Sequence, residues 1–374
     1  MLRRSLFLVA GLVVSALIVV GLIVGPGAGR GGDDHAAVRA RTTTSTTHAT
    51  TTGPTTTTTA PRRGSGQPVT FAFGGDVHFE GILRTKLQSD PGGMFSAIAP
   101  ELSAADIAMV NLETAITDRG TPEPKQYNFR TSPSALVALH AAGVDVVTEA
   151  NNHSRDYGAV GFDDTLAAKA GSPIPVLGIG HNATEASTPW QTVVHGQRIA
   201  VFGITDVLDD ALISTWTASD TQAGVASSKG ANQTRLEAAI RAVRSVSDTV
   251  VVYLHWGAEG LTCPTPRQQE LAAALVAAGA DIVVGSHAHR VAGGGRMGTA
   301  FVDYGLGNFA FYNESGAAGN TGVLNVTATG RDIDAYQWKP ARIVNGVPRL
   351  LTGDAAAQAS VMWESQRACT ALSP

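Results

Sequence analysis

Five of the ten histidines in this chain lie just after short, apolar, strand-like runs. Two carboxylates and an amide that can also bind metals follow runs of the same kind. The complete set is Asp76, His78, Glu113, Asn152, His153, His255, His287 and His289. Imidazoles and carboxylates together suit borderline divalent ions, and the scarcity of thiols argues against a closed structural zinc site. These residue types therefore predict a hydrolytic metal site.

The spacing of two motifs supports one shared site. Asp76 and His78 are separated by one residue, as are His287 and His289, so in extended backbone each pair projects from one face. Two ions about 3.5–4 Å apart can activate a water molecule and hold the oxygens of an in-line displacement. We therefore expect two divalent ions, manganese, iron or zinc, as cofactors. The alternative is that each side chain only caps or packs against its own strand.

Strands and helices must position these loops. Short apolar runs alternate with Ala-rich helical stretches, which is the pattern of an α/β fold. The expected strands are Val69–Phe73, Ile107–Val110, Val144–Val147, Ile199–Gly203, Thr249–Leu254, Ile282–Val284 and Phe301–Tyr304. The expected helices are Ser134–Ala142, Asp163–Ala170, Gln233–Val246 and Pro266–Ala278. Because α/β sheets bind ligands at the carboxyl ends of their strands, the motif loops should meet at one edge.

The amino-terminal segment predicts a membrane anchor. Arg3 and Arg4 precede an uncharged apolar run from Leu6 to Val24, and crossing a hydrocarbon core takes roughly 17–25 residues. A secretory signal has a shorter run and a small-residue cleavage site, which is poor here. We predict a signal-anchor over residues 1–26 and a single-pass protein whose carboxyl-terminal domain is extracytoplasmic. Cleavage and release is the alternative.

The remaining sequence predicts a stalk and one large domain. Thirteen of the eighteen residues from Thr42 to Thr59 are threonine, so we expect a disordered stalk over residues 27–66 and a single domain over residues 67–374. The net charge of −4 shows no basic surplus, so nucleic acid is not an expected partner. Cys263 and Cys369 are expected to form a disulfide outside the cytoplasm. Two buried, unpaired thiols are the alternative.

The order of the motifs resembles that of the CapA family. Those proteins are associated with capsule biosynthesis, typically of poly-γ-glutamate, and are often membrane-anchored with the domain outside. The matching motifs are Gly75-Asp76, Asn111-Leu112-Glu113, Asn151-Asn152-His153 with Asp156 and Gly158, His255-Trp256-Gly257 with Glu259, Gly285-Ser286-His287-Ala288-His289 and Leu306-Gly307-Asn308-Phe309. The family is similar to calcineurin-like metallophosphoesterases. That likeness implies a four-layer α/β fold with two packed sheets between helical layers.

The resemblance also implies a role for each residue. The first metal would be bound by Asp76, His78 and His289, and the second by Asn152, His255 and His287. Glu113 stands where the related enzymes usually have a bridging aspartate, and His153 would act on the leaving group. Many relatives have an apolar residue at the position of His78. Asp156 and Glu259 are further catalytic candidates, and Arg130, Arg155 and Asn308 are candidates for substrate binding.

These features predict a CapA-like cell-surface protein that is a dinuclear, phosphoesterase-like hydrolase. Its expected substrate is an anionic envelope polymer, such as poly-γ-glutamate, or a phosphorylated precursor. The alternative is a non-catalytic component of a membrane polymer-synthase or export complex, which binds metals and an anionic chain.

Overall fold

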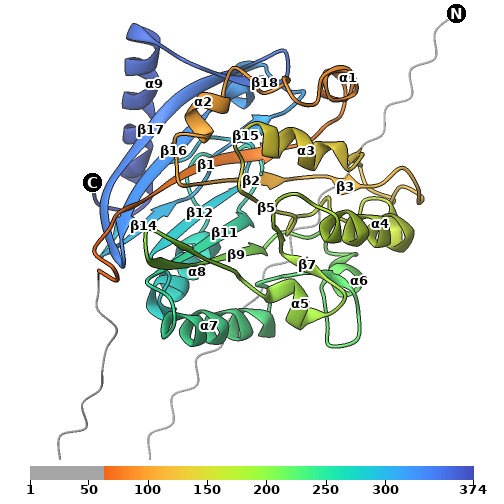
Figure 1. Cartoon of the computed structure of the whole chain (residues 1–374), viewed down its shortest axis with the longest axis horizontal. Coiled ribbons are helices and arrows are strands. Elements are labelled where there is room, and N and C mark those ends of the chain that lie inside the picture. The colour runs from red at the N-terminus through yellow and green to blue at the C-terminus, as the bar shows by residue number, and fades with distance from the viewer. Residues whose placement is uncertain (1–62) are drawn as a thin grey trace, which may run out of the picture. The chain divides into compact units, whose positions relative to one another are not determined.

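The computed structural model describes residues 63–374, which form two large β-sheets and the helices that cover them (Figure 1). The predicted anchor and most of the predicted stalk lie outside the described residues. Of the helices in residues 63–374, none combines the length and the apolar character needed to cross a membrane.

Residues that precede the predicted domain boundary at residue 67 already contact the rest of the domain. Arg63 forms ion pairs with Asp332 at 3.0 Å and with Asp334 at 3.2 Å. The side-chain amide of Gln197 donates a hydrogen bond to the backbone oxygen of Arg63 at 3.0 Å. The folded region therefore includes Arg63 and the residues that follow it.

The first sheet has eight strands in the order β18-β17-β16-β1-β2-β5-β6, with β15 paired to β1. The strands β2, β5, β6 and β15 run parallel to β1, whereas β16 pairs with it antiparallel. Their bounds are β1 (Val69–Val77), β2 (Ile107–Leu112), β5 (Val146–Thr148), β6 (Val176–Leu177), β15 (Asn308–Ala310), β16 (Asn320–Thr329), β17 (Asp332–Val344) and β18 (Val347–Leu350).

The second sheet has six strands in the order β13-β14-β12-β11-β9-β8. Its four inner strands are parallel, and the two edge strands β13 and β8 are antiparallel to their neighbours. Their bounds are β8 (Trp190–Val194), β9 (Gln197–Thr205), β11 (Thr249–Trp256), β12 (Ile282–His287), β13 (Gly294–Met297) and β14 (Ala300–Asp303).

Two small sheets and the helices complete the described region. The small sheets pair β3 (Ala115–Ile116) with β4 (Arg130–Thr131), and β7 (Ile179–Gly180) with β10 (Gly224–Val225). The helices are α1 (Ile82–Ser89), α2 (Ala99–Leu102), α3 (Ser134–Ala141), α4 (Gly158–Ala170), α5 (Ala183–Ser187), α6 (Ile213–Trp216), α7 (Ala231–Arg244), α8 (Pro266–Ala278) and α9 (Gly353–Gln366), with the 3-10 turns η1 (Gly316–Gly319) and η2 (Arg367–Cys369).

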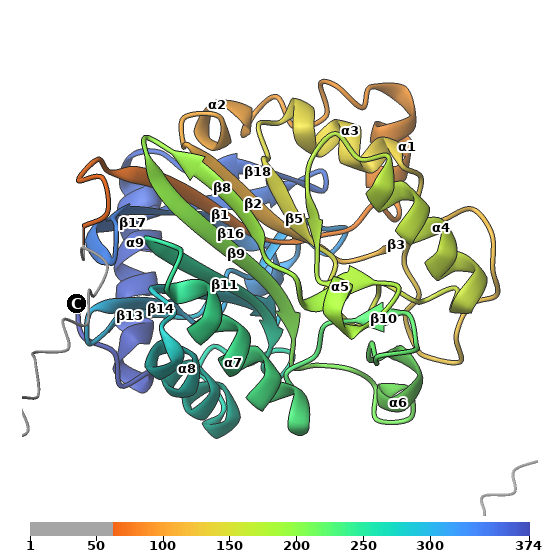
Figure 2. The same cartoon turned by 60° about the horizontal axis from the view of Figure 1, so that its bottom comes forward.

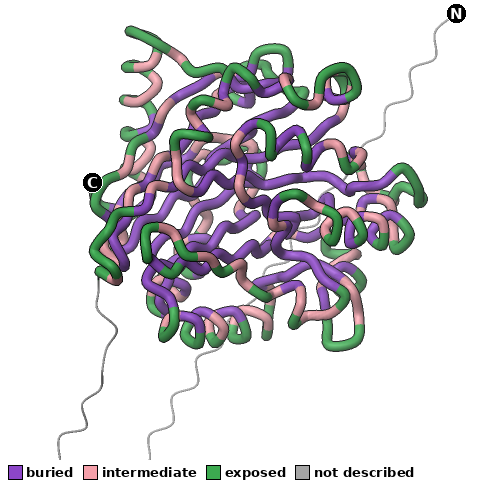
Figure 3. Tube along the Cα trace, viewed as in Figure 1, coloured by how far each residue is buried: buried purple, intermediate pink, exposed green. Residues whose placement is uncertain are grey.

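Alternating side chains of the strands create three buried layers. Phe71 and Phe73 of β1 share one apolar cluster with Val251 and Tyr253 of β11, so the two sheets pack face to face. The intervening Ala72 faces the side covered by α1 and α3, and residues of β11 on the other face pack against α7 and α8. Figures 1 and 2 show the two sheets between these helices, and Figure 3 shows the buried strands at the centre. The predicted four-layer α/β sandwich is confirmed.

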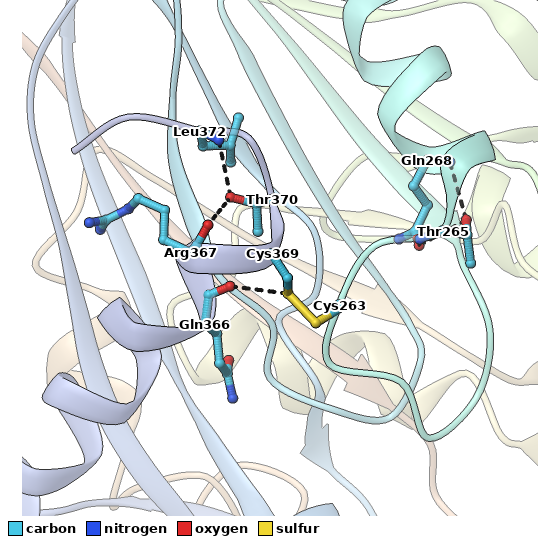
Figure 4. Close-up of a disulfide and its surroundings, with 8 residues drawn as sticks. All are labelled: Cys263, Thr265, Gln268, Gln366, Arg367, Cys369, Thr370 and Leu372. Atoms are coloured by element: carbon cyan, nitrogen blue, oxygen red, sulfur yellow. Dashed lines mark hydrogen bonds between the residues drawn. A yellow bond between two sulfur atoms is a disulfide. The ribbon is translucent and has the colours of Figure 1, made fainter.

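A disulfide joins the segment after β11 to the carboxyl-terminal end. Cys263 bonds Cys369 across a sequence separation of 106 residues, as predicted, and the structure contains no free cysteine in residues 63–374. Close to Cys263, Thr265 and Gln268 form a reciprocal capping box at the start of α8 (Figure 4). The helix ends at Ala278, and the next residue, Gly279, caps it in the left-handed conformation with a φ of 118°. These local signals explain why α8 has the predicted bounds.

Candidate metal centre and cavity

The carboxyl ends of parallel strands from both sheets carry the motif residues. Asp76 lies near the end of β1, and Glu113 directly follows β2. His255 and His287 lie at the ends of β11 and β12. The sheets meet here, because the backbone N–H of His287 donates to Oδ2 of Asp76 at 3.0 Å. The expectation that these loops share one edge is therefore confirmed.

Two groups of potential metal ligands lie at this edge. Glu113, His255 and His287 form one group, and Asp76, Glu113 and His289 form the other. Within each group, one ligand atom from each residue lies within 4.8 Å of the others. Glu113 belongs to both groups. This is the arrangement expected when one carboxylate bridges two ions, and the longer side chain of glutamate still reaches both groups.

Glu113 is an unpaired carboxylate in the interior. Its side chain is fully buried, and neither oxygen accepts a hydrogen bond from the described residues. Oε1 lies 3.4 Å from Nε2 of His255 and 3.8 Å from Nε2 of His153. Burying a charge without a partner costs several kcal/mol. A divalent cation would remove this cost, so the donor set fits the metal site that the sequence predicts.

Asp76 is held in its charged form by its neighbours. Its Oδ1 accepts a hydrogen bond from Nδ2 of Asn111 at 2.8 Å, and its Oδ2 lies 3.4 Å from Nδ1 of His289. Burial by itself raises the pKa of Asp76, but the hydrogen bond from His289 and the charges of His255 and His289 lower it well below its usual value. An ionised carboxylate is the form that binds a cation.

Asn152 lies beside the group that contains His255. Its Oδ1 is 2.8 Å from Nε2 of His255, and the same nitrogen lies 3.1 Å from Nδ1 of His287. The amide oxygen can thus serve as another ligand, as the resemblance implies. On the other side of the ring, Nδ1 of His255 lies 3.1 Å from Nδ2 of Asn111.

The backbone at two of the histidines is strained. His287 has a φ of 93° and His289 a φ of 52°, values that residues other than glycine seldom adopt. Strained conformations of this kind cluster at functional sites. Burial lowers the pKa of His287, which keeps its ring neutral and able to bind a metal. Burial also acts to lower the pKa of His289, but Glu113 and Asp76 raise it to about 9. A metal must therefore displace a proton from His289.

His78 lies outside both groups of ligands. Its Nδ1 accepts a hydrogen bond from the backbone N–H of Glu80 at 2.9 Å, and its Nε2 is 3.3 Å from the backbone nitrogen of Tyr312. The ring stacks on Phe129 with centroids 4.6 Å apart and meets Phe311 edge-on at 4.0 Å. The structure therefore places this predicted ligand among aromatic side chains, and it leaves the first group to Asp76, Glu113 and His289.

His153 forms a dyad with Asp156. Its Nδ1 lies 2.6 Å from Oδ2 of Asp156, which also accepts the backbone N–H of Phe129 at 2.6 Å. The Phe129 ring stacks on His153 with centroids 4.2 Å apart. Lys125 pairs with the other Asp156 oxygen at 2.9 Å. Burial raises the pKa of Asp156 to about 7, although Lys125 opposes this effect.

The two arginines predicted to bind substrate contact residues outside both ligand groups. The guanidinium of Arg130 lies 4.7 Å from the ring centroid of Tyr157. Arg155 donates to the backbone oxygens of Thr215 and Ala223, and its guanidinium lies over the ring of Phe162. Both cations thus hold neighbouring segments, and their role in substrate binding stays a prediction.

Asn308, also predicted to bind substrate, contacts one of the potential metal ligands. Its Oδ1 lies 2.7 Å from Nδ1 of His289, and its Nδ2 donates to the backbone oxygen of Ala318 at 3.0 Å. Its side chain is buried and therefore orients His289. Glu259, in contrast, is exposed at the edge of the site.

A cavity of about 340 Å³ opens over the metal centre. Its lining includes the predicted residues His153, Glu259, His289 and Asn308. The other lining residues are Tyr127, Phe129, Gly260, Arg290, Phe311, Tyr312, Asn313 and Ala318. Of these, Arg290 directly follows the Ser-His-Ala-His motif. Its place in the sequence could therefore have indicated that it lies close to the ligands. Phe311 and Tyr312 follow the Leu306-Gly307-Asn308-Phe309 motif, whereas Tyr127 and Phe129 belong to a loop without such a motif.

Two further asparagines hold the ligand loops together. Nδ2 of Asn151 donates to Oδ1 of Asn111 at 3.1 Å and to the backbone oxygen of Leu112 at 2.9 Å. Oδ1 of Asn151 accepts the backbone N–H of His153 at 2.9 Å. Both asparagines belong to the motifs shared with the CapA family, but their residue type alone does not indicate this connecting role. They connect the loop after β5 to β2 and, through Asn111, to Asp76.

Comparison with known proteins identifies a matching family and several relatives. Residues 70–313 match the family described as bacterial capsule synthesis protein PGA_cap. The capsule biosynthesis protein CapA of Bacillus anthracis is 31% identical over 58% of this chain and 53% of its own length. The PGA biosynthesis protein CapA of Bacillus subtilis is 29% identical over 65% of this chain and 63% of its own length.

A third relative is a probable polyglutamine synthesis accessory protein of Mycobacterium tuberculosis, which is 30% identical over 50% of this chain and 51% of its own length. The chain thus spans about half to two thirds of the length of these relatives. The family match covers more than half of the chain and contains every residue of both ligand groups. The chain therefore belongs to the bacterial capsule synthesis protein family PGA_cap.

Proposed function

We propose that this protein is a metal-dependent hydrolase that cleaves an ester, phosphoester or amide bond in an envelope polymer or its precursor. The observation that carries the proposal is the buried, unpaired carboxylate of Glu113, which two groups of ligands share. Asp76 and His289 complete one group, and His255 and His287 complete the other. Divalent ions held there would polarise the scissile bond and lower the pKa of a water molecule.

His153 is placed to give a proton to the leaving group. Its Nδ1 contacts Asp156, which directs Nε2 toward Glu113 and the cavity. Burial and the charge of Lys125 lower the pKa of His153, so the protonated ring is a strong acid. A positioned acid of this kind typically contributes about 10²–10⁴ to the rate.

The proposed location is the outer side of the cell membrane, with the domain attached to the predicted anchor. The disulfide between Cys263 and Cys369 supports an extracytoplasmic site, because such bonds persist in oxidising compartments. The proposed substrate is an anionic polymer or a phosphorylated precursor, in keeping with the capsule and PGA biosynthesis named for the relatives.

A second candidate is a non-catalytic role in a polymer-synthase or export complex. The description of the Mycobacterium tuberculosis relative as a probable accessory protein favours it. In that case the metals would bind an anionic chain without cleaving it.

Metal analysis and a substrate screen distinguish the two functions. The purified full-length chain should bind close to two divalent ions and hydrolyse members of a panel of phosphomonoesters, phosphodiesters, esters and amides. The Glu113→Gln variant should lose both properties. Metal-loaded wild-type protein without any turnover, but with metal-dependent binding of oligo-γ-glutamate, would support the second candidate instead.

A further inference from the structure

The cavity over the metal centre has an exposed aromatic rim. Tyr127 and Tyr312 are 50% and 41% exposed, and they are the only exposed aromatic residues among the large hydrophobic ones of residues 63–374. Beneath them lie the buried rings of Phe129 and Phe311, with centroids 6.5 Å from Tyr127 and 5.4 Å from Tyr312, respectively. Large aromatic faces left open beside a polar site provide flat contact surfaces for a ligand.

The polar side chains of the same cavity are nearly balanced in charge. Glu259 supplies one carboxylate and Arg290 one guanidinium, and Asn313 adds an amide. One Nη of Arg290 donates to the backbone oxygen of His289 at 2.8 Å, which holds the guanidinium beside the metal centre. Apart from the metal ligands, the lining offers a single permanent cation. It therefore has no series of positive charges that would follow a chain of carboxylates.

We propose that this cavity binds a sugar ring and that the substrate is a phosphorylated saccharide. The exposed rings of Tyr127 and Tyr312 supply aromatic surface to which the weakly positive C–H groups of a sugar can bind. Glu259 accepts hydrogen bonds from hydroxyl groups, and Arg290 and Asn313 donate hydrogen bonds to them. A carboxylate-rich polymer would instead meet the negative faces of the rings and Glu259. The inference rests on the proposed function, since the phosphate must lie at the ligand groups below.

The reaction is the hydrolysis of a phosphomonoester. A bond forms between phosphorus and the oxygen of water, and the bond between phosphorus and the sugar oxygen breaks. The sugar oxygen takes a proton from His153, whose proton is replaced from the attacking water. Inorganic phosphate and the free saccharide are the products, and no oxidant or other co-substrate is needed.

Matched substrates and variants test the inference. Glucose 6-phosphate and glycerol 3-phosphate carry the same reacting group, but only the first has a ring. Tyr127→Ala and Tyr312→Ala should each raise KM for glucose 6-phosphate about tenfold and change KM for glycerol 3-phosphate less than threefold. Val193→Ala, which shortens an exposed apolar side chain on β8, should match wild-type protein.

A binding measurement separates this inference from the proposed function. Saturation-transfer NMR of glucose 6-phosphate on metal-loaded wild-type protein should show ring protons in contact with the protein, and both tyrosine variants should weaken the signal. If both phosphoesters turn over equally and neither alanine variant matters, the sugar site is refuted while the hydrolase stands. If nothing turns over but tyrosine-dependent sugar binding persists, the hydrolase fails and the sugar site stands. If oligo-γ-glutamate bound in a tyrosine-dependent manner and the sugar did not, the sugar site would also be refuted.

Discussion

Oε1 of Glu113 lies 3.4 Å from Nε2 of His255, yet neither Glu113 oxygen accepts a hydrogen bond from the described residues. A buried carboxylate in this state destabilises the metal-free protein, because its oxygens accept no hydrogen bond from the described residues. The same feature makes it an effective ligand. Glu113 therefore links metal binding to the free energy of unfolding.

This linkage predicts opposite effects of Glu113→Gln with and without metal. Without metal, the variant should unfold at a higher temperature than wild-type protein, since an amide costs less to bury than a carboxylate. With manganese or zinc added, wild-type protein should gain stability in proportion to the logarithm of metal concentration, and the variant should gain little. Thermal unfolding followed by circular dichroism, together with metal analysis, measures both effects.

Glu149 provides a matched control for Glu113. It is also fully buried with unpaired oxygens, but it belongs to neither ligand group. Burial raises the pKa of Glu149 well above its usual value, which favours its neutral, protonated form. Glu149→Gln should thus leave metal content unchanged. If both variants lost metal to the same extent, a bridging role for Glu113 would be refuted.

His78 tests the assignment of the first metal. We expect His78→Phe to bind metal with the wild-type stoichiometry, because the ring already lies between Phe129 and Phe311 and outside both ligand groups. Losing the hydrogen bond from Glu80 should cost about 1–3 kcal/mol of stability. His289→Phe should instead reduce the metal content. Atomic emission measures the metal content of both variants. If His78→Phe and His289→Phe lost metal equally, His78 would be a metal ligand.

The position of His78 illustrates which part of the site sequence alone could predict. The alternation of Asp76 and His78 assumes that extended backbone continues past the end of β1. The pairing of β1 with β15 shifts register between Asp76 and Val77, and β1 ends at Val77, so regular strand geometry does not continue to His78. The loops that meet at the sheet edge follow from parallel strands and were predictable.

Other features depended on distant parts of the chain. Arg130 and Arg155 have long side chains whose direction is set by Tyr157 and Phe162, and a sequence does not reveal those neighbours. The hairpin of β16 and β17 and the helix α9 were not expected, since no strand was predicted after Tyr304. The burial of β17 alternates unevenly, and the Ala-rich α9 buries only Trp363. Patterns of that kind are weak in sequence.

His153 should affect catalysis and leave metal binding intact. Its ring is fixed by the contact with Asp156 and by stacking on Phe129. We expect His153→Gln to lower kcat by about 10²–10⁴, the usual contribution of a positioned acid, with unchanged metal content. His181→Gln is the control, because that histidine is exposed, pairs with Glu185 of α5 and does not line the cavity. A variant with wild-type kcat would exclude His153 from proton transfer.

The disulfide should stabilise the fold mainly by lowering the conformational entropy of the unfolded chain. A bond that closes a loop on the order of 100 residues contributes about 4.7 kcal/mol by loop entropy, and Cys263 and Cys369 are separated by 106 residues. Changing both cysteines to serine should therefore lower the urea midpoint substantially. Reductant should destabilise wild-type protein in the same way and leave the double variant unaffected. Equal midpoints for all four samples would show that the bond does not form.

Asp303 should make stability depend on pH. Its carboxyl group is fully buried; Oδ1 accepts the backbone N–H of Gly305 at 3.0 Å, and Oδ2 is unpaired among the described residues. Burial raises the pKa of Asp303 from 3.8 to about 7. Between about pH 4 and about pH 7 the folded state keeps the proton of Asp303, whereas the unfolded state has released it. The free energy of unfolding therefore decreases as pH rises from about 4 to about 7.

The variant Asp303→Asn should remove this dependence, because an amide can still accept from Gly305 and does not ionise. Relative to wild-type protein, the variant should become progressively more stable across that pH range, by at most about 4 kcal/mol, since a tenfold change in an equilibrium constant is about 1.4 kcal/mol. Above pH 7 the difference should stay constant. Urea unfolding of both proteins at several pH values measures it. A difference independent of pH would mean that Asp303 is already ionised at low pH in the folded state, and that burial does not control its charge.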